Sequence, residues 1–154
     1  MSYVPPASIL QGLPLETAQK FGMPSINAHY AGKGVRTNRL DDEAMCAFCR
    51  RPATNAHHVP NVGMGARNKG FRLHGHVLRP ALIALCGSGT TGCHGDCHNG
   101  RMAIRWVWDS DEYSEAWWEG DLLDEFGEGS PMLYEFGYWE LKQAMGSKVR
   151  RIRY

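Results

Sequence analysis

Apolar and polar residues recur with different periods along the chain, and these periods predict its secondary structure. Three stretches have the short apolar runs or the two-residue alternation that are typical of β-strands. Three others favour helices, and one of these is a short stretch rich in Cys, His and Gly. The predicted strands are residues 53–59, 80–86 and 104–109, and the predicted helices are residues 93–103, 114–126 and 130–146.

The strongest helix signal lies near the C-terminus. Ser130 suits the N-cap, Pro131 suits the first helical position, and Gly146 suits the position just past the end. A shorter helix is predicted within residues 13–22, because this stretch ends near a glycine that suits a C-terminal cap. The Gly-rich basic stretch 61–76 is predicted to be a loop.

The order of elements in the middle of the chain, which is strand, loop, strand and helix, indicates an α+β fold. A chain of 154 residues is long enough for one domain with a modest core. We divide it into an extended or loosely ordered N-terminal segment (residues 1–40), a central core (residues 41–105) and a C-terminal extension that packs on this core (residues 106–154).

The net charge of +1 conceals segments of opposite sign. Residues 31–105 hold eleven Lys or Arg and four Asp or Glu, a net charge of +7. Residues 106–147 hold one Lys and eleven Asp or Glu, a net charge of −10, and residues 148–154 add +4. A basic segment that coincides with a Cys/His cluster favours a polyanionic partner, most simply nucleic acid. The alternative is two solvated faces whose charges neutralise each other within the fold.

The chain has five cysteines, and this odd number argues against a disulfide framework and favours metal binding. The first ten residues lack a basic region followed by an apolar run, so we expect no signal peptide. No apolar stretch approaches the length of a membrane span. We therefore expect a cytoplasmic protein with reduced thiols and no membrane partner.

Cys46 and Cys49 have the C-x2-C spacing of a zinc knuckle, and Cys86 and Cys93 follow downstream. Four thiolates around a tetrahedral Zn²⁺ form a closed, structural site. Such a site would tie the start of the core to its middle and contribute on the order of 10 kcal/mol to folding. The alternative is that some of these residues are buried free thiols, which are common in protein cores.

Cys93 and Cys97 compete for the fourth place in this site. In a helix they lie at positions i and i+4 and share one stripe, while His94 and His98 share a second stripe about 100° away. Sulfur can then face zinc while imidazole faces a different site. We favour Cys93 as the ligand and keep Cys97 as the alternative. The three residues between these cysteines argue against a covalent haem motif, which needs two.

His57 and His58 are neighbours on a predicted strand, where successive side chains point to opposite faces. Different roles are therefore natural, because one ring can bind a metal ion while the other handles a proton. With His94 and His98 they supply four imidazoles from a strand and a following helix. A lone His is usually a surface or core residue, but here two pairs flank the cysteines.

The segment "AHHV" followed by "ALIALCGSGTTGCHGDCH" resembles the HNH endonucleases, whose nuclease core is the ββα-metal fold. The combination of C-x2-C, HH, "LCGSGTTGCHG" and a later His is similar to the zinc-stapled HNH proteins of phages and mobile elements. The resemblance covers residues 46–102. It implies a small ββα-metal core in residues 41–105 that is stapled by a four-cysteine zinc site, with an added strand and C-terminal helices, and a phage or prophage origin.

The resemblance also implies a role for each matching residue. His57 is the first ligand of a catalytic divalent ion, and His58 is the general base. His94 is a metal ligand on the helix, and His98 is a second helical ligand or a phosphate contact. The implied catalytic ion is Mg²⁺, Mn²⁺, Ni²⁺ or Zn²⁺. The implied ligands of the structural zinc are Cys46, Cys49, Cys86 and Cys93.

These roles match the needs of phosphodiester hydrolysis. A neutral His near pH 7 can accept a proton from water, and a divalent cation can stabilise the phosphate and leaving oxygens. The glycines of stretch 61–76 allow its backbone to approach DNA closely, where basic side chains bind phosphates. A solvated connector is the alternative for this stretch. The candidate DNA contacts are Arg67, Lys69, Arg72 and Arg79.

One position departs from the family pattern. Ala81 stands where the family's middle Asn usually lies, and Asn61, Asn68 and Asn99 are nearby but do not fit cleanly. We predict a metal-dependent HNH endonuclease that nicks DNA or cleaves both strands. The alternative is a non-catalytic, zinc-stabilised nucleic-acid-binding module, and Ala81 keeps this alternative open.

The C-terminal third carries all five tryptophans, and their spacing favours core positions over a binding face. The acidic surface of this third would repel DNA, so we expect it to orient the substrate or to meet a protein partner. A zinc-stabilised protein-interaction domain is therefore a third hypothesis.

Overall fold

The structure is a computed structural model, and its fold is α+β, as the sequence predicts. It describes residues 3–15, 18, 21–24, 35–36, 39–40, 45–59, 71–78, 81–88, 90–127, 130–146 and 148–153.

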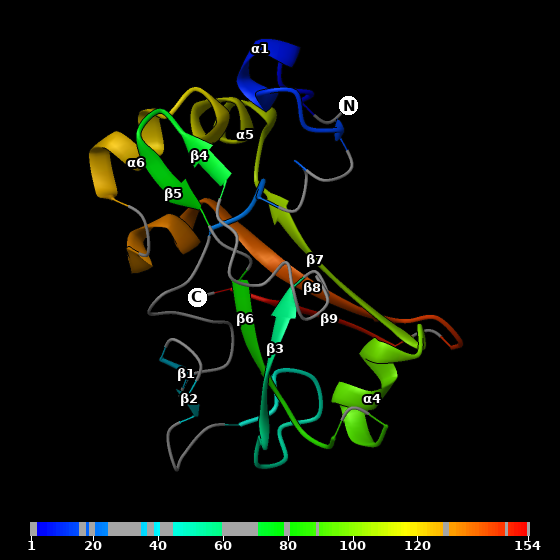
Figure 1. Cartoon of the computed structure of the whole chain (residues 1–154). Coiled ribbons are helices and arrows are strands. Elements are labelled where there is room, and N and C mark those ends of the chain that lie inside the picture. Colours follow the sequence, from blue (N-terminus) through cyan, green and yellow to red (C-terminus); the bar gives the residue numbers. More distant parts are fainter. Residues whose placement is uncertain are drawn as a thin grey trace.

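Two strands and a helix form the middle of the chain. β3 (Asn55–Val59) pairs antiparallel with β6 (Ala81–Leu85), and α4 (Gly92–His98) follows. Figure 1 shows α4 beside the end of this strand pair. These elements confirm the two predicted strands and the predicted helix, although α4 ends five residues before residue 103. The helix is short because its C-cap, Asn99, and the following Gly100 leave helical geometry; Gly100 has a positive φ of 82°.

The prediction of a loop over residues 61–76 is wrong for its last part. β4 (Phe71–Leu73) and β5 (His76–Leu78) form a hairpin between β3 and β6 in the chain. His74 and Gly75 connect the two strands, and both have positive φ, as a two-residue hairpin turn requires. Phe71 and Leu73 point one way and are buried, so a two-residue alternation decides the conformation here. Residues 61–70 lie outside the described residues.

The predicted helix over residues 130–146 is also wrong. Its start is right, because the Ser130 hydroxyl accepts a hydrogen bond from the amide of Met132 and opens a 3-10 helix, η1 (Pro131–Phe136). From there the chain continues as β8 (Gly137–Gln143). β8 pairs along its whole length with β7 (Met102–Trp108), which confirms the predicted strand over residues 104–109. Aromatic residues in β8 favour a strand once a partner strand is available.

β9 (Val149–Ile152) completes a three-stranded antiparallel sheet in the order β7-β8-β9. The predicted helix over residues 114–126 is present as two helices, α5 (Asp111–Trp118) and α6 (Asp121–Phe126). Gly120, which has a φ of 89°, separates them. The N-terminal segment contains α1 (Ala7–Leu10) and the short pair β1 (Val35–Arg36) and β2 (Arg39–Leu40). Within residues 13–22, the described residues Leu15 and Ala18 are helical.

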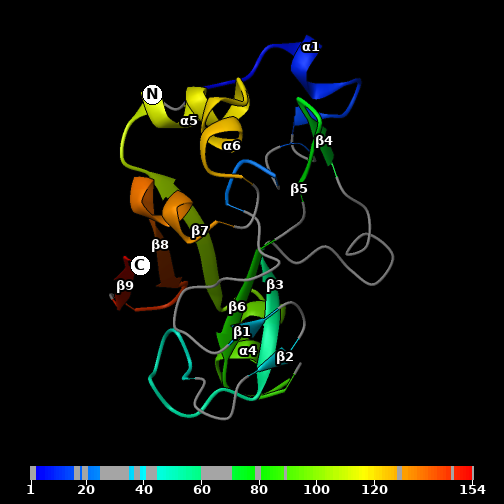
Figure 2. The same cartoon turned by 90° about the vertical axis from the view of Figure 1, so that its left-hand side faces the viewer.

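Two hydrophobic cores organise the molecule. The first joins the C-x2-C turn, β6 and α4 to the inner face of the three-stranded sheet, where Trp139 and Leu141 are buried. The second joins α1, the β4-β5 hairpin, α5 and α6 around Trp117 and Trp118. Figure 2 shows the elements of the second core at one end of the molecule and β3, β6 and α4 at the other. These buried tryptophans confirm that Trp spacing in the C-terminal third marks core positions.

Opposite charges from distant segments meet on the three-stranded sheet. Glu140 accepts hydrogen bonds from Arg105 at 2.9 Å and from Arg151 at 3.4 Å. Asp109 accepts two hydrogen bonds from the guanidinium of Arg153, at 2.7 and 3.0 Å. The basic C-terminal strand therefore neutralises part of the acidic segment, as the second interpretation of the charge pattern expects. No helix among the described residues has the length and apolar character needed to cross a membrane.

Candidate metal centres

The sulfur atoms of four cysteines converge at one end of the strand pair. The candidate ligand atoms all lie within 4.8 Å of one another, and the Cys49 and Cys86 sulfurs are 3.5 Å apart. Cys46 is fully buried and Cys93 nearly so, while the other two are half-buried. The set consists of Cys46, Cys49, Cys86 and Cys93.

Backbone hydrogen bonds form the turn that carries the first two cysteines. The Cys46 amide donates to the Arg51 carbonyl at 2.7 Å, and the Arg50 amide donates back to the Cys46 carbonyl at 3.1 Å. Arg50 has a positive φ of 68°, which closes the turn. The Ala47 amide donates to the Ala84 carbonyl of β6 at 2.9 Å, so the turn is attached to the strand that leads to Cys86.

Glycines in and just after the stretch from Cys86 to Cys93 allow the chain to double back on itself. Gly87 has a φ of 90°, and a Cβ there would lie 2.0 Å from the Thr91 carbonyl oxygen. Gly95 lies in α4, and a Cβ there would lie 2.5 Å from the Thr90 carbonyl carbon. This compact loop places the first turn of α4 beside the end of β6, where the His94 amide donates to the Cys86 carbonyl at 2.9 Å.

The surroundings of the thiols shift the pKa values of Cys46 and Cys93 in opposite directions. Burial raises the pKa of the Cys46 thiol, but hydrogen bonds from the backbone of Cys49, Cys86 and Phe48 outweigh it, and the net pKa is lowered. Burial, together with the charge of Cys46, raises the pKa of Cys93 far above its ordinary value. Four thiolates this close repel one another unless a cation lies between them. Such a cation would deprotonate them outright.

The spacing of the sulfurs fits a tetrahedral metal ion better than a disulfide. A zinc–sulfur bond of about 2.3 Å places two ligand sulfurs about 3.8 Å apart, whereas bonded sulfurs lie about 2.05 Å apart. The distance of 3.5 Å between Cys49 and Cys86 is close to the first value. These four cysteines could therefore hold a metal ion, and their chemistry is compatible with structural zinc.

Cys97 is not part of this group. It packs against the first core, and burial, with the charges of Asp96 and Cys46, raises the pKa of its thiol to about 12. Cys97 therefore remains a neutral thiol near pH 7. The structure thus places Cys93, rather than Cys97, with the three other sulfurs.

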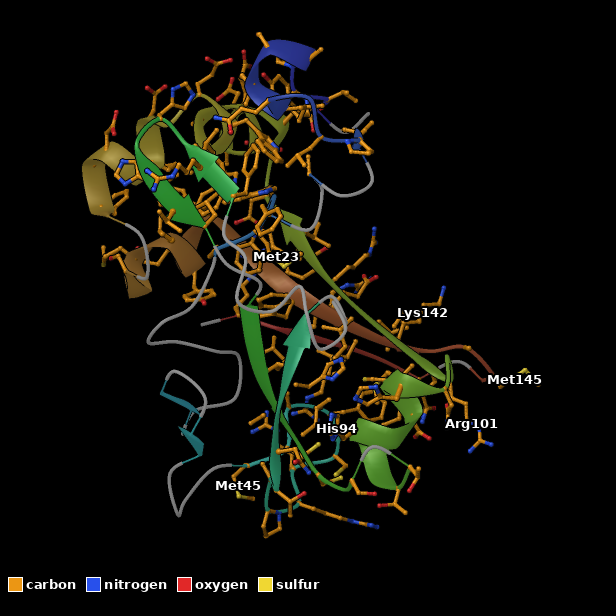
Figure 3. The ribbon with its side chains drawn as sticks, in the orientation of Figure 1. Met23, Met45, His94, Arg101, Lys142 and Met145 are labelled. Atoms are coloured by element: carbon orange, nitrogen blue, oxygen red, sulfur yellow. The ribbon has the colours of Figure 1, made fainter. Side chains whose placement is uncertain are left out.

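Three imidazoles form a second cluster between β3 and α4. His57, His94 and His98 each offer one nitrogen, and these nitrogens lie within 4.8 Å of one another. The ring centroid of His57 lies 5.1 Å from each of the other two rings. His57 is buried, His94 is half-buried and His98 is exposed, so the cluster opens to solvent at His98. Figure 3 shows His94 on the side of α4 that faces β3.

The two imidazole rings on α4 are close enough to bind one cation together. The Nε2 atoms of His94 and His98 are 2.9 Å apart, so they can share one proton or one metal ion. Burial and the neighbouring His98 lower the pKa of His94, and the backbone of Gly87 acts in the opposite direction. His94 is therefore neutral near pH 7, which is the form that binds metals.

Both clusters take ligands from the same helix. Cys93 and His94 are adjacent in α4, but one contributes to the thiol cluster and the other to the imidazole cluster. Neighbouring residues on a helix are about 100° apart around its axis. Interleaving of Cys and His in the sequence thus becomes separation in space, as the helical interpretation predicts.

Two polar residues near this site were not identified from the sequence. The Thr54 hydroxyl donates to the Gly87 carbonyl at 2.8 Å, and the Asn55 side-chain amide donates to the same oxygen. They attach the start of β3 to the loop that leads into α4, and so they hold His57 near the helical histidines. No sequence motif marks them, because the contact joins positions more than thirty residues apart.

The remaining candidate residues either lie away from these clusters or are not described by the structure in full. His58 follows His57 in β3 and pairs with Leu82, but its side chain is not among those described. Arg72 is exposed on the β4-β5 hairpin, which belongs to the second core. Three of the candidate DNA contacts lie outside the described residues: Arg67, Lys69 and Arg79.

Comparisons with known proteins do not show a family for this chain. No family model matches it, and no solved structure matches it. It is similar to Protein GrpE in two strains of Vibrio cholerae serotype O1, with 35% identity over 71 residues. This match covers 46% of the chain and 31% of the GrpE protein, so the chain spans less than a third of the length of these relatives.

Proposed function

We propose that this protein is a metal-dependent endonuclease of the HNH type that hydrolyses DNA phosphodiester bonds. β3, β6 and α4 follow the strand-strand-helix order that the resemblance implies for a ββα-metal core. In this proposal the four grouped cysteines hold structural Zn²⁺. His57, His94 and His98 hold the catalytic divalent ion. A cytoplasmic setting and a phage or prophage origin are part of the same proposal.

The observation that carries the proposal is the pairing of one closed cluster with one open cluster on a single helix. The thiol cluster is largely buried and offers four ligands, which suits a structural ion. The imidazole cluster offers three ligands and ends at the exposed His98. Three ligands with an open side leave room for a substrate oxygen, which is the arrangement of catalytic sites.

Each residue then has a definite task. A divalent ion bound by the three imidazoles supplies a positive charge that stabilises the phosphate in the transition state. His58 accepts a proton from the attacking water, which requires the neutral ring. The lowered pKa of His94 favours its neutral ring, which is the form that binds metals. Thr54 and Asn55 hold the loop before α4, so they are positioning residues.

A plasmid nicking assay tests the proposal. Supercoiled DNA is incubated with the zinc-loaded protein and Mg²⁺, Mn²⁺ or Ni²⁺, and conversion to open circles or linear DNA is followed on a gel. His58→Ala prepared in parallel controls for contaminating nucleases. Cleavage by the wild type that is lost in His58→Ala supports the proposal. Equal cleavage by both proteins, or none with any of the three ions, would refute it.

A second candidate is a zinc-stabilised module that binds nucleic acid without cutting it. Ala81 favours this candidate, since it begins β6, opposite Val59, where an Asn is expected from the resemblance. An apolar methyl group there cannot make the hydrogen bonds of an amide. DNA binding at low salt, together with intact plasmid under all three ions, would identify this module.

A further inference from the structure

The turn that joins β8 to β9 presents an apolar side chain to solvent near α4, the helix that carries His94 and His98. Met145 is 86% exposed, the largest value among the exposed large apolar residues of the described chain. Figure 3 shows Met145 at the tip of this turn, pointing away from the protein, with Arg101 and Lys142 near the same end of α4. A single exposed Met is ordinary by itself, so its surroundings decide its meaning.

Hydrogen bonds fix this turn to the chain segment that follows α4. The Ala144 amide donates to the Arg101 carbonyl at 2.8 Å. The Arg101 amide donates in turn to the Asp96 carbonyl of α4 at 2.8 Å. The position of Met145 is therefore tied to the helix that carries His94 and His98.

A second set of contacts attaches the other side of the turn to the C-x2-C segment. The Lys148 ammonium lies 5.1 Å from the centre of the Phe48 ring. The Arg150 guanidinium donates to the Phe48 carbonyl at 3.0 Å. The described residues on either side of the turn are thus attached to the segments that carry the two candidate metal clusters.

The charge around Met145 suits a polyanion. From Leu141 to the C-terminus the sequence holds five Lys or Arg and no Asp or Glu. Within the described residues, no ion pair joins Lys142 or Lys148 to a carboxylate, and Arg101 forms only a long, exposed ion pair with Asp96, at 4.0 Å. Proteins that kink DNA often insert an apolar side chain between base steps and place basic side chains beside it, and Met145 with its basic neighbours has this composition.

The turn also lies near enough to the imidazole cluster to touch the same duplex. Three residue steps separate His98 from Arg101, so their Cα atoms are at most about 11 Å apart. One base-pair step advances a duplex by about 3.4 Å, so this separation corresponds to about three steps. The turn is therefore close enough for one duplex to reach both it and the histidines.

We propose that Met145 is a wedge that inserts between neighbouring base pairs of double-stranded DNA, while Arg101 and Lys142 bind the flanking phosphates. This inference rests on the proposed function, because it places the DNA at the imidazole cluster. Met is unbranched and polarisable, so it can stack against exposed base faces. Unstacking one step kinks the duplex, and the kink opens the backbone near the histidines.

The test uses a 30-base-pair duplex in which several adenines are replaced by 2-aminopurine, whose fluorescence rises when it unstacks. The protein carries His58→Ala, so the duplex stays intact whether or not the wild type cuts DNA. Binding by this protein should raise the fluorescence. Adding Met145→Ala should remove most of this rise and weaken binding about tenfold, while Met145→Leu should keep it. Met132→Ala is the matched control, because Met132 is an exposed Met on η1.

Two results would overturn the wedge: an unchanged fluorescence rise with Met145→Ala, or an equal loss with Met132→Ala. Failure of the protein to bind the duplex would overturn it as well. Arg101→Gln and Lys142→Gln should each flatten the slope of log K against log salt by about one unit, and an unchanged slope contradicts their part. These experiments measure binding and base unstacking, not cleavage. A wild type that fails to nick plasmid DNA therefore refutes the proposed nuclease but leaves the test of the wedge valid.

Discussion

His94 and His98 lie one turn apart on α4, and their Nε2 atoms are 2.9 Å apart. Two Nε2 atoms that both carried a proton could not approach this closely, so this geometry suits a pair that shares one proton or one metal ion. Burial and the neighbouring His98 act in the same direction by lowering the pKa of His94.

Replacing the general base should separate catalysis from metal binding. His58→Ala should lower the cleavage rate by about 10²–10⁴, while the affinities for the divalent ion and for DNA stay unchanged. His94→Ala should instead weaken binding of the divalent ion, so a higher metal concentration should recover part of the activity of this variant. His76→Ala is a suitable control, because His76 pairs with Asp124 on α6, away from the cluster. Wild-type cleavage rates in His58→Ala would disprove this mechanism.

The thiol cluster should hold one zinc ion that is needed for folding. Cys46→Ser and Cys86→Ser should give zinc-free, unfolded or insoluble protein, since the binding energy of a structural zinc is folding energy. Cys97→Ser is the matched control, because this thiol lies outside the cluster, and it should keep the zinc content of the wild type. Elemental analysis and circular dichroism measure both properties. Well-folded wild type without zinc would contradict this assignment.

The glycine loop provides a test that separates backbone strain from steric overlap. Gly87 and Gly100 both have positive φ, at 90° and 82°, but only Gly87 has backbone atoms where a Cβ would lie. Gly100→Ala should therefore cost about 1 kcal/mol of unfolding free energy, from strain alone. Gly87→Ala should cost more than about 3 kcal/mol and release zinc. Denaturant unfolding with zinc present measures both, and equal costs would show that the loop tolerates a side chain.

The sheet should lose stability in acid through Glu140. Hydrogen bonds from Arg105, and further contacts with Arg151, hold the pKa of this carboxyl below its ordinary value of 4.5. Its contribution is therefore present above about pH 4.5 and is lost as the pH falls through the lower folded-state pKa. Because both arginines are largely exposed, Glu140→Gln should cost only about 0.5–1 kcal/mol at pH 7.

This cost should shrink as the pH falls below about 4.5, because the wild-type carboxyl then becomes neutral too. Urea unfolding at several pH values measures the difference between the two proteins. Glu135→Gln, which changes an exposed carboxylate on η1, serves as the control and should have little effect at any pH. A cost for Glu140→Gln that is constant from pH 7 to pH 3 would exclude the ion pairs as its source.

Binding to DNA should depend on salt through the basic stretch between β3 and β4. Replacing both Arg67 and Lys69 with Ala should flatten the slope of log K against log salt by about two units, because two phosphate contacts are lost. Fluorescence anisotropy with a labelled duplex measures the slope. If slope and affinity stay the same as in the wild type, this stretch does not contact DNA.

The sequence predicts the strand pair β3 and β6, helix α4 and the grouping of the cysteines, because the patterns that indicate them lie within each short segment. The spacing of Cys and His sets the two faces of α4, and apolar runs mark β3 and β6. β8 was missed because Ser130 and Pro131 are genuine helix-start signals, but the helix lasts only until Phe136. Pairing with β7 then decides the conformation, and no local pattern reveals a partner strand thirty residues away.

The hydrogen bonds that hold the candidate sites in place are not predictable from the sequence for the same reason. The contacts of Thr54 and Asn55 with Gly87, and of Ala144 with Arg101, each join distant positions through a backbone carbonyl. A carbonyl is present at every residue, so the sequence does not single out the one that accepts. The hairpin turn at His74 and Gly75 is the exception, since a Gly between two short apolar stretches is a local signal for a turn, although the sequence analysis predicts a loop there.

A helix of seven residues is marginal in isolation, and α4 bears ligands for both candidate ions. Binding at the thiols would order α4 and so reduce the entropic cost of gathering His94 and His98. The two sites would then share a coupling free energy. By linkage, a divalent ion at the histidines would raise the affinity for zinc by the same factor by which zinc raises the affinity for the divalent ion. With both ions bound, the interleaved Cys and His residues would thus couple the two binding equilibria.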